Sequence, residues 1–406
     1  MSQKRSIPPP LGDTHNFGRH VTLRDGRIHK PRTVVWERLV LSGASPLRRL
    51  LDAAARDDVL GPDAFGFLPD LAFPSSRVRH GGEVERITLT PLPAPSHAGR
   101  RALAGIVGRA LALFTWLGVS DLHWENLVLG KDARGHVVFA PLDVEMVLAD
   151  LSMPTETKLL PDADPEYAEI CRHACGVRRV LPYLGKPVGG AEIVEMADGY
   201  LRTLAFLDRH ASAIAEVFNA LPGLHETPIR VCLRGTGEYV RARSEPIWPP
   251  LLDAEAEQLA RGDIPYFFRV YGQPGIRYFT ERTLRRVGRL PLRGDVPHLD
   301  PLLSLSRGLR APSRTKLREE GLFTLLGAFD HTGLAGTFAS DALEVTFRPR
   351  TLVVKDVKAA AGEELRAGRN LSAFVGSVYL PCRCGEVRTV FVPSVTVCEA
   401  GAGVAS

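Results

Sequence analysis

Cysteine is scarce in this sequence, with six residues among 406. So few cysteines cannot hold a chain of this length together as a small disulfide-bonded scaffold. The excess of charge of one sign is small as well, because 51 Lys and Arg are balanced by 46 Asp and Glu, which leaves a net charge of +5. This small excess does not favour a nucleic-acid partner, and Arg-rich stretches such as 281–294 are more typical of solvated faces.

Long hydrophobic runs are also rare. The N-terminal 15 residues contain no apolar stretch, so we expect no signal peptide. The most apolar segment, 102–119, carries Arg109 near its centre, which favours a buried core helix over a membrane span. We therefore expect a cytoplasmic protein without a membrane span. With 45% hydrophobic and 24% charged residues, the chain has the composition of a globular protein of two or three domains.

Local patterns predict a mixed α+β fold. Strands are expected on both sides of a turn at 25–26, at 86–90, and in the tail at 342–356 and 371–398. Helices are expected at 45–58, at about 98–117, over most of 150–228, and in a short piece at 359–370. Residues 127–129 and 136–142 are expected to form a hairpin around a turn at 130–135.

Two motifs carry the chemistry: DLHWEN at 121–126 and LDVE at 142–145. Phosphoryl transfer from ATP needs a carboxylate that deprotonates the accepting hydroxyl, and an amide oxygen and a second carboxylate that hold the metal. Asp121, Asn126 and Asp143 follow one another in that order. The hairpin between Asn126 and Asp143 would bring the two to the same mouth, so the pattern indicates a kinase-like site.

A Lys that neutralises phosphates is the remaining requirement, and Lys30 lies at the end of an N-terminal strand. Just before it, the backbone amides of the Gly-bounded segment 12–19 could cover phosphates. Each motif alone has a plain structural explanation, because Asp and Asn commonly serve in turns and strand-end carboxylates are commonly solvated. The order of the motifs favours the functional interpretation.

At this point the sequence resembles a family, the dehydratase domain of class II lanthipeptide synthetases. The resemblance spans about residues 12–300 and rests on five segments in the family's order: GDTHNFGRHVTLRDGRIHKPR at 12–32, DLHWENLVL at 121–129, LDVEM at 142–146, PIRVCLRGTGEYV at 228–240 and RGDIPYF at 261–267. It implies a two-lobed fold similar to protein and lipid kinases. It also implies phosphorylation of Ser and Thr in a precursor peptide with ATP and Mg²⁺, followed by elimination of phosphate to dehydroamino acids.

The resemblance also implies roles for individual residues. It gives catalytic roles, in transfer or in elimination, to Asp121, His123, Arg230, Arg234 and Thr236. It places ATP against Lys30, Asp13, His15 and Gly18. It places Mg²⁺ at Asn126, Asp143 and Glu145.

The two arginines can also be argued from their own segment. Apolar residues alternate with Arg230 and Arg234 in the strand-like stretch 227–236, which would direct both guanidinium groups to one side. Arg binds phosphate oxygens bidentately and so suits a departing phosphate. The alternative is a solvated basic face.

The expected organisation is an N-terminal kinase-like lobe at 1–97, a catalytic lobe at 98–300 and a partly strand-rich extension at 301–406. We expect no counterpart here of the family's long region before the Gly-Asp-x-His motif or of its C-terminal zinc cyclase. A separate cyclase or other modifying enzyme is therefore an expected partner beside the precursor peptide. Two other functions stay open: a kinase that stops at the phosphoester, and a non-catalytic subunit that binds nucleotide or peptide.

Overall fold

The computed structural model describes residues 11–148, 151, 154–160, 175–185, 187–248, 250–271, 273–290, 318, 321–329 and 333–358, with three further strands at 364–370, 377–381 and 387–391. The fold is mixed α+β, as the sequence predicts, and its sheets are antiparallel. The longer helices are α2 (Pro46–Arg56), α3 (His97–Trp116), α6 (Gly190–Arg209), α7 (Ala211–Asn219) and α9 (Asp253–Ala260). The shorter ones are α1 (Val35–Leu41), α5 (Leu181–Leu184), α8 (Thr236–Arg241) and α11 (Gly321–Gly327).

The strands form four sheets. The first has the order β1-β2-β3-β5-β4, from β1 (Leu11–His15), β2 (Arg19–Arg24), β3 (Arg27–Lys30), β4 (Ser75–Ser76) and β5 (Gly82–Glu85). The second is the hairpin of β6 (Leu127–Lys131) and β7 (Val137–Pro141). The third has the order β11-β10-β9-β8, from β8 (Pro228–Val231), β9 (Phe267–Val270), β10 (Gln273–Phe279) and β11 (Val287–Arg289).

Several predicted elements are confirmed. The expected helix at 45–58 is α2, and its N-cap is Ser45, whose hydroxyl accepts a hydrogen bond from the Arg48 amide at 3.1 Å. The expected helix at 98–117 is α3, and the expected hairpin is β6–β7. The strand expected at 86–90 is wrong, because β5 ends at Glu85 and Thr90 makes only an isolated bridge to Lys131.

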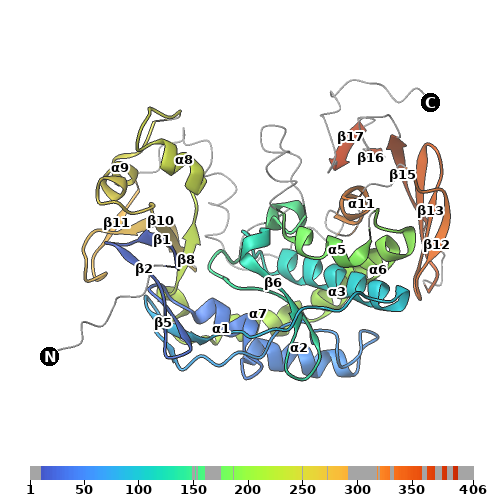
Figure 1. Cartoon of the computed structure of the whole chain (residues 1–406), viewed down its shortest axis with the longest axis horizontal. Coiled ribbons are helices and arrows are strands. Elements are labelled where there is room, and N and C mark those ends of the chain that lie inside the picture. Colours follow the sequence, from blue (N-terminus) through green and yellow to red (C-terminus); the bar gives the residue numbers. More distant parts are fainter. Residues whose placement is uncertain are drawn as a thin grey trace.

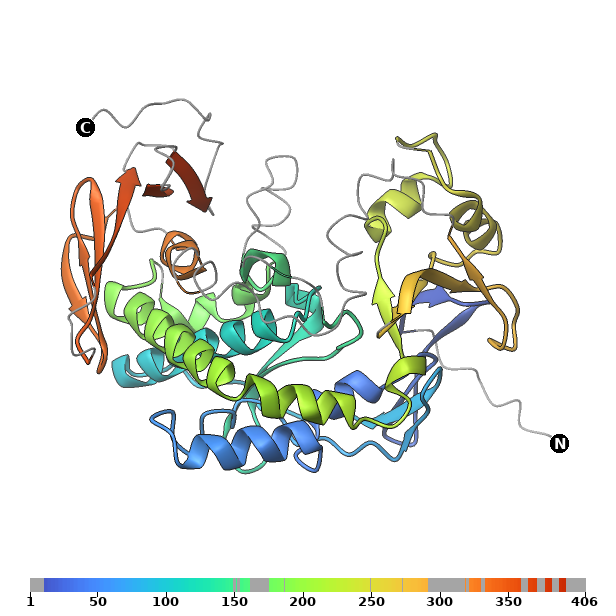
Figure 2. The same ribbon diagram turned by 180° about the vertical axis from the view of Figure 1, so that it is seen from behind.

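The first and third sheets lie together, next to α8 and α9, in both views of the chain (Figure 1, Figure 2). The amide of Ile264 donates to the carbonyl of Thr14 at 2.8 Å, and Phe17 packs against the apolar cluster that contains Tyr266 and Phe268. The described part of residues 228–290 therefore packs against the N-terminal hairpin of β1 and β2. The division predicted from the sequence groups them with 98–300 and does not anticipate this association.

The main core is built around α3 and α6, which run side by side in the centre of the molecule (Figure 2). They approach closely at glycines: a Cβ on Gly108 would lie 2.0 Å from the carbonyl oxygen of Met196, and one on Gly199 would lie 2.6 Å from that of Gly105. Side chains at Gly108 and Gly199 would push the helices apart. Among the described helices, none has both the length and the apolar character that crossing a membrane requires.

The tail forms the fourth sheet, which lies beside α11 and the N-terminal end of α6 (Figure 1). Its order is β12 (Gly336–Ala339), β13 (Leu343–Phe347), β14 (Thr351–Asp356), β15 (Glu364–Asn370), β16 (Ser377–Pro381) and β17 (Val387–Phe391). Buried side chains such as Val345 and Phe347 belong to the same core as α3 and α6. The described part of the extension therefore packs on the main body. The short helix expected at 359–370 is wrong where the structure describes it, because β15 pairs with β14 and strand pairing overrides its helix-forming residues.

Candidate functional site

The hairpin β6–β7 brings two of the predicted residues together. Leu127 is opposite Pro141, and the amide of Leu142 donates to the carbonyl of Asn126 at 2.7 Å. Asn126 and Asp143 therefore flank the same open end of the hairpin, called here the hairpin mouth. This confirms that the two motifs meet there. Leu142 is exposed there, although the strands behind it are largely buried.

Asp121 lies in an unusual backbone conformation at this mouth. Its φ is +67°, in the left-handed region that non-glycine residues seldom adopt. The side-chain amide of Asn126 donates to the Asp121 carbonyl at 2.9 Å and to its Oδ2 at 3.3 Å. His123 accepts from the Glu125 amide through Nδ1, and its Nε2 lies 4.0 Å from Asp121 Oδ1. Asn126 thus holds the Asp121 carboxylate by hydrogen bonding, and His123 lies beside it.

Lys30, at the end of β3, forms a buried ion pair with a residue that the sequence analysis did not single out. Its ammonium donates to Oε1 of Glu37 in α1 at 2.7 Å and to the carbonyl of Leu142 at 2.8 Å. The Lys30 and Glu37 side chains are 6% and 1% exposed. The available signal was a single carboxylate in the helix after Lys30, whose other residues are apolar except for Arg38. Protein kinases use a strand-Lys to helix-Glu pair of this kind.

Arg32 occupies the centre of the site. Its guanidinium lies 2.8 Å from Glu37 Oε1 and 2.8 Å from Glu145 Oε2, and it also pairs with Asp143. Glu145 pairs in turn with Arg230 in β8. These six residues form one network of three cations and three carboxylates, called here the charged cluster: Lys30, Arg32, Glu37, Asp143, Glu145 and Arg230.

The charged cluster shifts the ionisation of its members. Burial by itself would raise the pKa of Asp143, but the nearby charges of Arg32 and Lys30 outweigh it, so this pKa lies well below its usual range. For Glu37 burial dominates and raises the pKa despite the same two cations. Burial disfavours the charged form of Arg230, but Glu145 more than compensates and raises the Arg230 pKa. Asp143 is therefore held as an anion.

The structure separates the two arginines that the sequence predicted would face one way. β8 ends at Val231, and Arg234 lies beyond it. Arg234 Nε donates to Glu255 Oε1 at 3.0 Å, and Nη2 donates to the Pro250 carbonyl at 2.9 Å. Thr236 is exposed in the first turn of α8. Of the three residues predicted for elimination, only Arg230 pairs within the charged cluster.

The Gly-bounded loop makes its backbone hydrogen bonds to a side chain of the protein. Asp263 is fully buried and accepts from the amides of Phe17 at 2.7 Å and Gly18 at 2.8 Å. The amides of this turn therefore bind a carboxylate of the chain, in the place where the sequence analysis expected phosphate. Asp13 is exposed, at the outer side of the same loop.

His15, the last residue of β1, is influenced by the charges of Arg230 and Glu145 in the charged cluster. Its Nδ1 lies 2.7 Å from the Ile264 carbonyl, so that nitrogen carries a proton, and its ring contacts Tyr266. Burial, aided by the positive charge of Arg230, lowers the pKa of His15 from its ordinary 6.5. The folded protein therefore holds His15 as a neutral imidazole at neutral pH.

Because the pKa of His15 is lowered by folding, its stabilising effect should be complete above pH 6.5 and fade as the pH falls toward its folded pKa. We expect His15→Gln, which keeps a donor for the Ile264 carbonyl, to weaken the loss of stability between pH 7 and pH 5. Urea denaturation at several pH values measures this slope, with His20→Gln as the control. Equal slopes in wild type and His15→Gln would contradict the assignment.

The residues at the hairpin mouth fit a magnesium ion bound together with phosphates. Asn126 turns its amide nitrogen to Asp121, which leaves its oxygen as the possible ligand, and Asp143 is kept ionised. In the described part of the chain, no group of three or more His, Cys, Asp or Glu could hold a metal. Mg²⁺ usually takes one or two carboxylates and completes its shell with water and phosphate, so a full protein cage is not needed.

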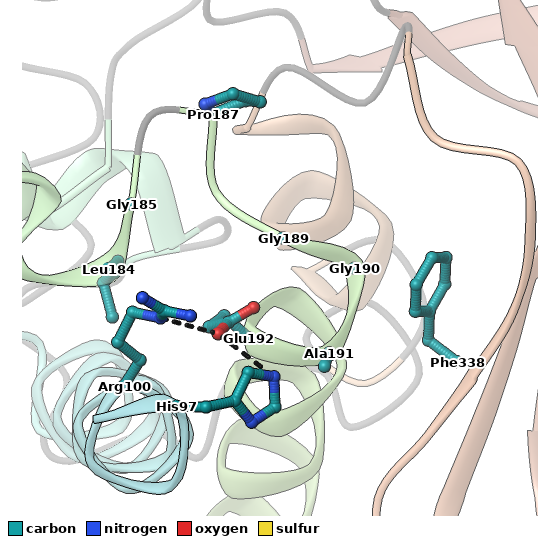
Figure 3. Close-up of a pocket in the computed structure, with 10 residues that line it drawn as sticks. All are labelled: His97, Arg100, Leu184, Gly185, Pro187, Gly189, Gly190, Ala191, Glu192 and Phe338. Carbon is teal, nitrogen blue, oxygen red and sulfur yellow. Dashed lines mark hydrogen bonds and ion pairs between the residues drawn. The ribbon is translucent and has the colours of Figure 1, made fainter. Parts of the chain in front are cut away.

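A separate pocket lies between the first turns of α3 and α6 and the tail sheet (Figure 3). It has a volume of about 370 Å³. Arg100 and His97 approach Glu192, at 3.3 Å and 4.0 Å, and Phe338 closes the side toward β12. None of the residues that line it belongs to the charged cluster or to the hairpin mouth.

Comparison with known proteins adds no assignment. No protein-family model matches the chain, and no curated protein matches it.

Proposed function

We propose that this protein transfers the γ-phosphoryl group of ATP to Ser and Thr hydroxyls of a precursor peptide and then eliminates phosphate, as in the lanthipeptide dehydratases it resembles. The observation that carries the proposal is the buried Lys30–Glu37 pair, whose ammonium also binds the hairpin at Leu142. Phosphoryl transfer of the kinase type requires such a pair beside a catalytic Asp and a metal-binding Asn and Asp. A two-lobed kinase-like arrangement belongs to the same proposal.

In the first step, Asp121 would accept the proton of the attacking hydroxyl, because its carboxylate is fixed by Asn126 and lies at the open mouth. Lys30 would neutralise phosphate charge, and Asn126 and Asp143 would hold Mg²⁺. When bound, Mg²⁺ neutralises the charge that develops on the phosphates. Glu145 has Arg32 on one oxygen and Arg230 on the other, so its role here is to position these two arginines.

In the second step, a base takes the α-proton, the C–H electron pair forms the Cα–Cβ double bond, and the Cβ–O bond breaks as phosphate leaves. A guanidinium stabilises this departing dianion best, because its planar fork can bind two phosphate oxygens. Arg230 is linked to Asp143 through Glu145 and Arg32, which supports a role for this arginine of its segment toward a phosphoester formed at the hairpin mouth. This favours the dehydratase over a kinase that stops at the phosphoester.

Binding of Mg²⁺ with a non-hydrolysable ATP analogue tests the first part. We expect calorimetry to show binding that needs Mg²⁺, and about tenfold to a hundredfold weaker binding by Lys30→Gln, since a hydrogen bond to a charged group is worth about 1.5–3 kcal/mol. Lys131→Ala, in β6 of the hairpin that Lys30 contacts through the Leu142 carbonyl, is the matched control. Failure of the wild-type protein to bind the analogue would overturn the proposal.

A further inference from the structure

Lys158 lies in no motif of the sequence analysis, yet it reaches the residue proposed to accept the proton. Its Nζ is 3.4 Å from Asp121 Oδ1. The Lys158 side chain is 54% exposed, whereas Lys30 is 6% exposed. Because the Lys158 side chain is exposed beside Asp121, its ammonium can contact a substrate more readily than the buried ammonium of Lys30.

The backbone at Lys158 is held in a costly conformation. Its φ is +62°, close to the +67° of Asp121. Lysine gains nothing locally from the left-handed region, in contrast to Gly, Asn or Asp. Non-glycine residues in that region persist where their surroundings over-determine them, and such residues gather at functional sites. Two of them in contact with each other therefore invite a functional explanation.

Hydrogen bonds from both sides hold the Lys158 segment against the Asp121 segment. The amide of Leu122 donates to the Thr157 carbonyl at 2.9 Å, and the Ser120 hydroxyl donates to the Glu156 carbonyl at 2.7 Å. The Lys158 amide donates to the Thr155 carbonyl at 2.8 Å. The first two bonds bracket Asp121, so the backbone places the Lys158 segment next to Asp121, and the Lys158 side chain spans the remaining distance.

We propose that Lys158 is a further catalytic residue, which binds the phosphoryl group as it passes from ATP to the acceptor. This inference rests on the proposed function. The acceptor oxygen forms a bond to the γ-phosphorus, the bond between that phosphorus and the β–γ bridging oxygen breaks, and the acceptor proton moves to Asp121. Lys158 stays protonated throughout.

The gain from Lys158 is larger in the transition state than before it. As Asp121 takes up the proton, its attraction for Lys158 weakens, and negative charge is present on the transferring oxygens instead. The ammonium can then bind those oxygens. An interaction that strengthens along the reaction raises the turnover rate and not the affinity for ATP.

The test uses the full chain and steady-state hydrolysis of Mg·ATP, in which water replaces the peptide hydroxyl. We expect Lys158→Ala to lower kcat by about 10²–10³-fold, as for the loss of one charge-stabilising group, with the KM for ATP changed less than threefold. Lys158→Arg should recover at least tenfold of that loss, because it restores the cation. Lys131→Ala should behave as wild type.

Lys158→Gly separates catalysis from folding. Glycine adopts a φ of +62° without strain, so this variant should unfold at the wild-type temperature or higher and still have the low kcat of Lys158→Ala. A wild-type kcat in Lys158→Gly would overturn the role of Lys158. If kcat is normal there while Asp121→Asn is inactive, the proposed function stands without Lys158. If Asp121→Asn hydrolyses Mg·ATP at the wild-type rate, both proposals fall.

Discussion

Asparagine in place of Asp143 is expected to lower the rate of Mg·ATP hydrolysis by at least a hundredfold. The carboxylate of Asp143 is held ionised beside Arg32, at the end of the hairpin where Asn126 supplies its amide. The substitution keeps the shape of the side chain and removes the charge that Mg²⁺ prefers. Loss of one charge-stabilising group of this kind costs about 2.7–4 kcal/mol in the transition state.

The fold should survive this substitution, because Arg32 keeps two carboxylate partners, Glu37 and Glu145. Thermal unfolding followed by circular dichroism checks that point alongside the rate measurement. Asp52→Asn is the matched control, since Asp52 also pairs with an arginine, Arg48, but lies in α2. A rate within threefold of wild type in Asp143→Asn would show that Asp143 does not hold the metal.

The hairpin mouth could be predicted from the sequence because its geometry is local. Strand alternation and a turn between 130 and 135 fix a two-stranded hairpin, and the pairing of such a hairpin brings its ends together. Asn126 precedes the first strand and Asp143 follows the second, so their approach follows from chain order alone. The same holds for α2, whose Ser45 cap and Pro46 mark its start.

The centre of the charged cluster could not be predicted in this way. Arg32 pairs with Asp143, and the Val144 amide donates to Glu37 at 3.4 Å, only because folding brings residues 30–37 to the segment after β7. No spacing in the sequence encodes a contact between segments about a hundred residues apart. The contact between Lys158 and Asp121 could not be predicted either, because these two residues come together only in the folded chain. Arg230 and Arg234 were expected to share a direction, but that holds only within one continuous strand or helix, and β8 ends between them.

The tail shows the limit of local propensity. Residues 359–370 contain Ala, Glu, Leu and Arg, which favour a helix in isolation. In the structure, Leu365 and Ala367 lie opposite Val354 and Leu352 of β14. Hydrogen bonding to an existing strand outweighs a helical preference of a few tenths of a kcal/mol per residue.

The largest effect on the chemical outcome is expected for Arg230→Ala, which should turn a dehydratase into a kinase. With a peptide that the wild type dehydrates, mass spectrometry should show added phosphate where the wild type shows loss of water. The departing phosphate loses its guanidinium, so elimination should slow by about 10²–10³-fold. Phosphorylation should change much less, because Glu145 still positions Arg32 beside Asp143.

Arg234→Ala is the matched control for this separation of steps. Arg234 and its partner Glu255 are 5% and 1% exposed, and breaking a buried pair of this kind costs about 3–5 kcal/mol of stability. We therefore expect Arg234→Ala to lower the denaturation midpoint without accumulating phosphopeptide. Arg230→Lys, which keeps a charge beside Glu145 but loses the planar fork, should phosphorylate normally and eliminate at an intermediate rate. Dehydration by Arg230→Ala at the wild-type rate would remove Arg230 from the second step, and stable phosphopeptide from the wild type itself would leave a kinase.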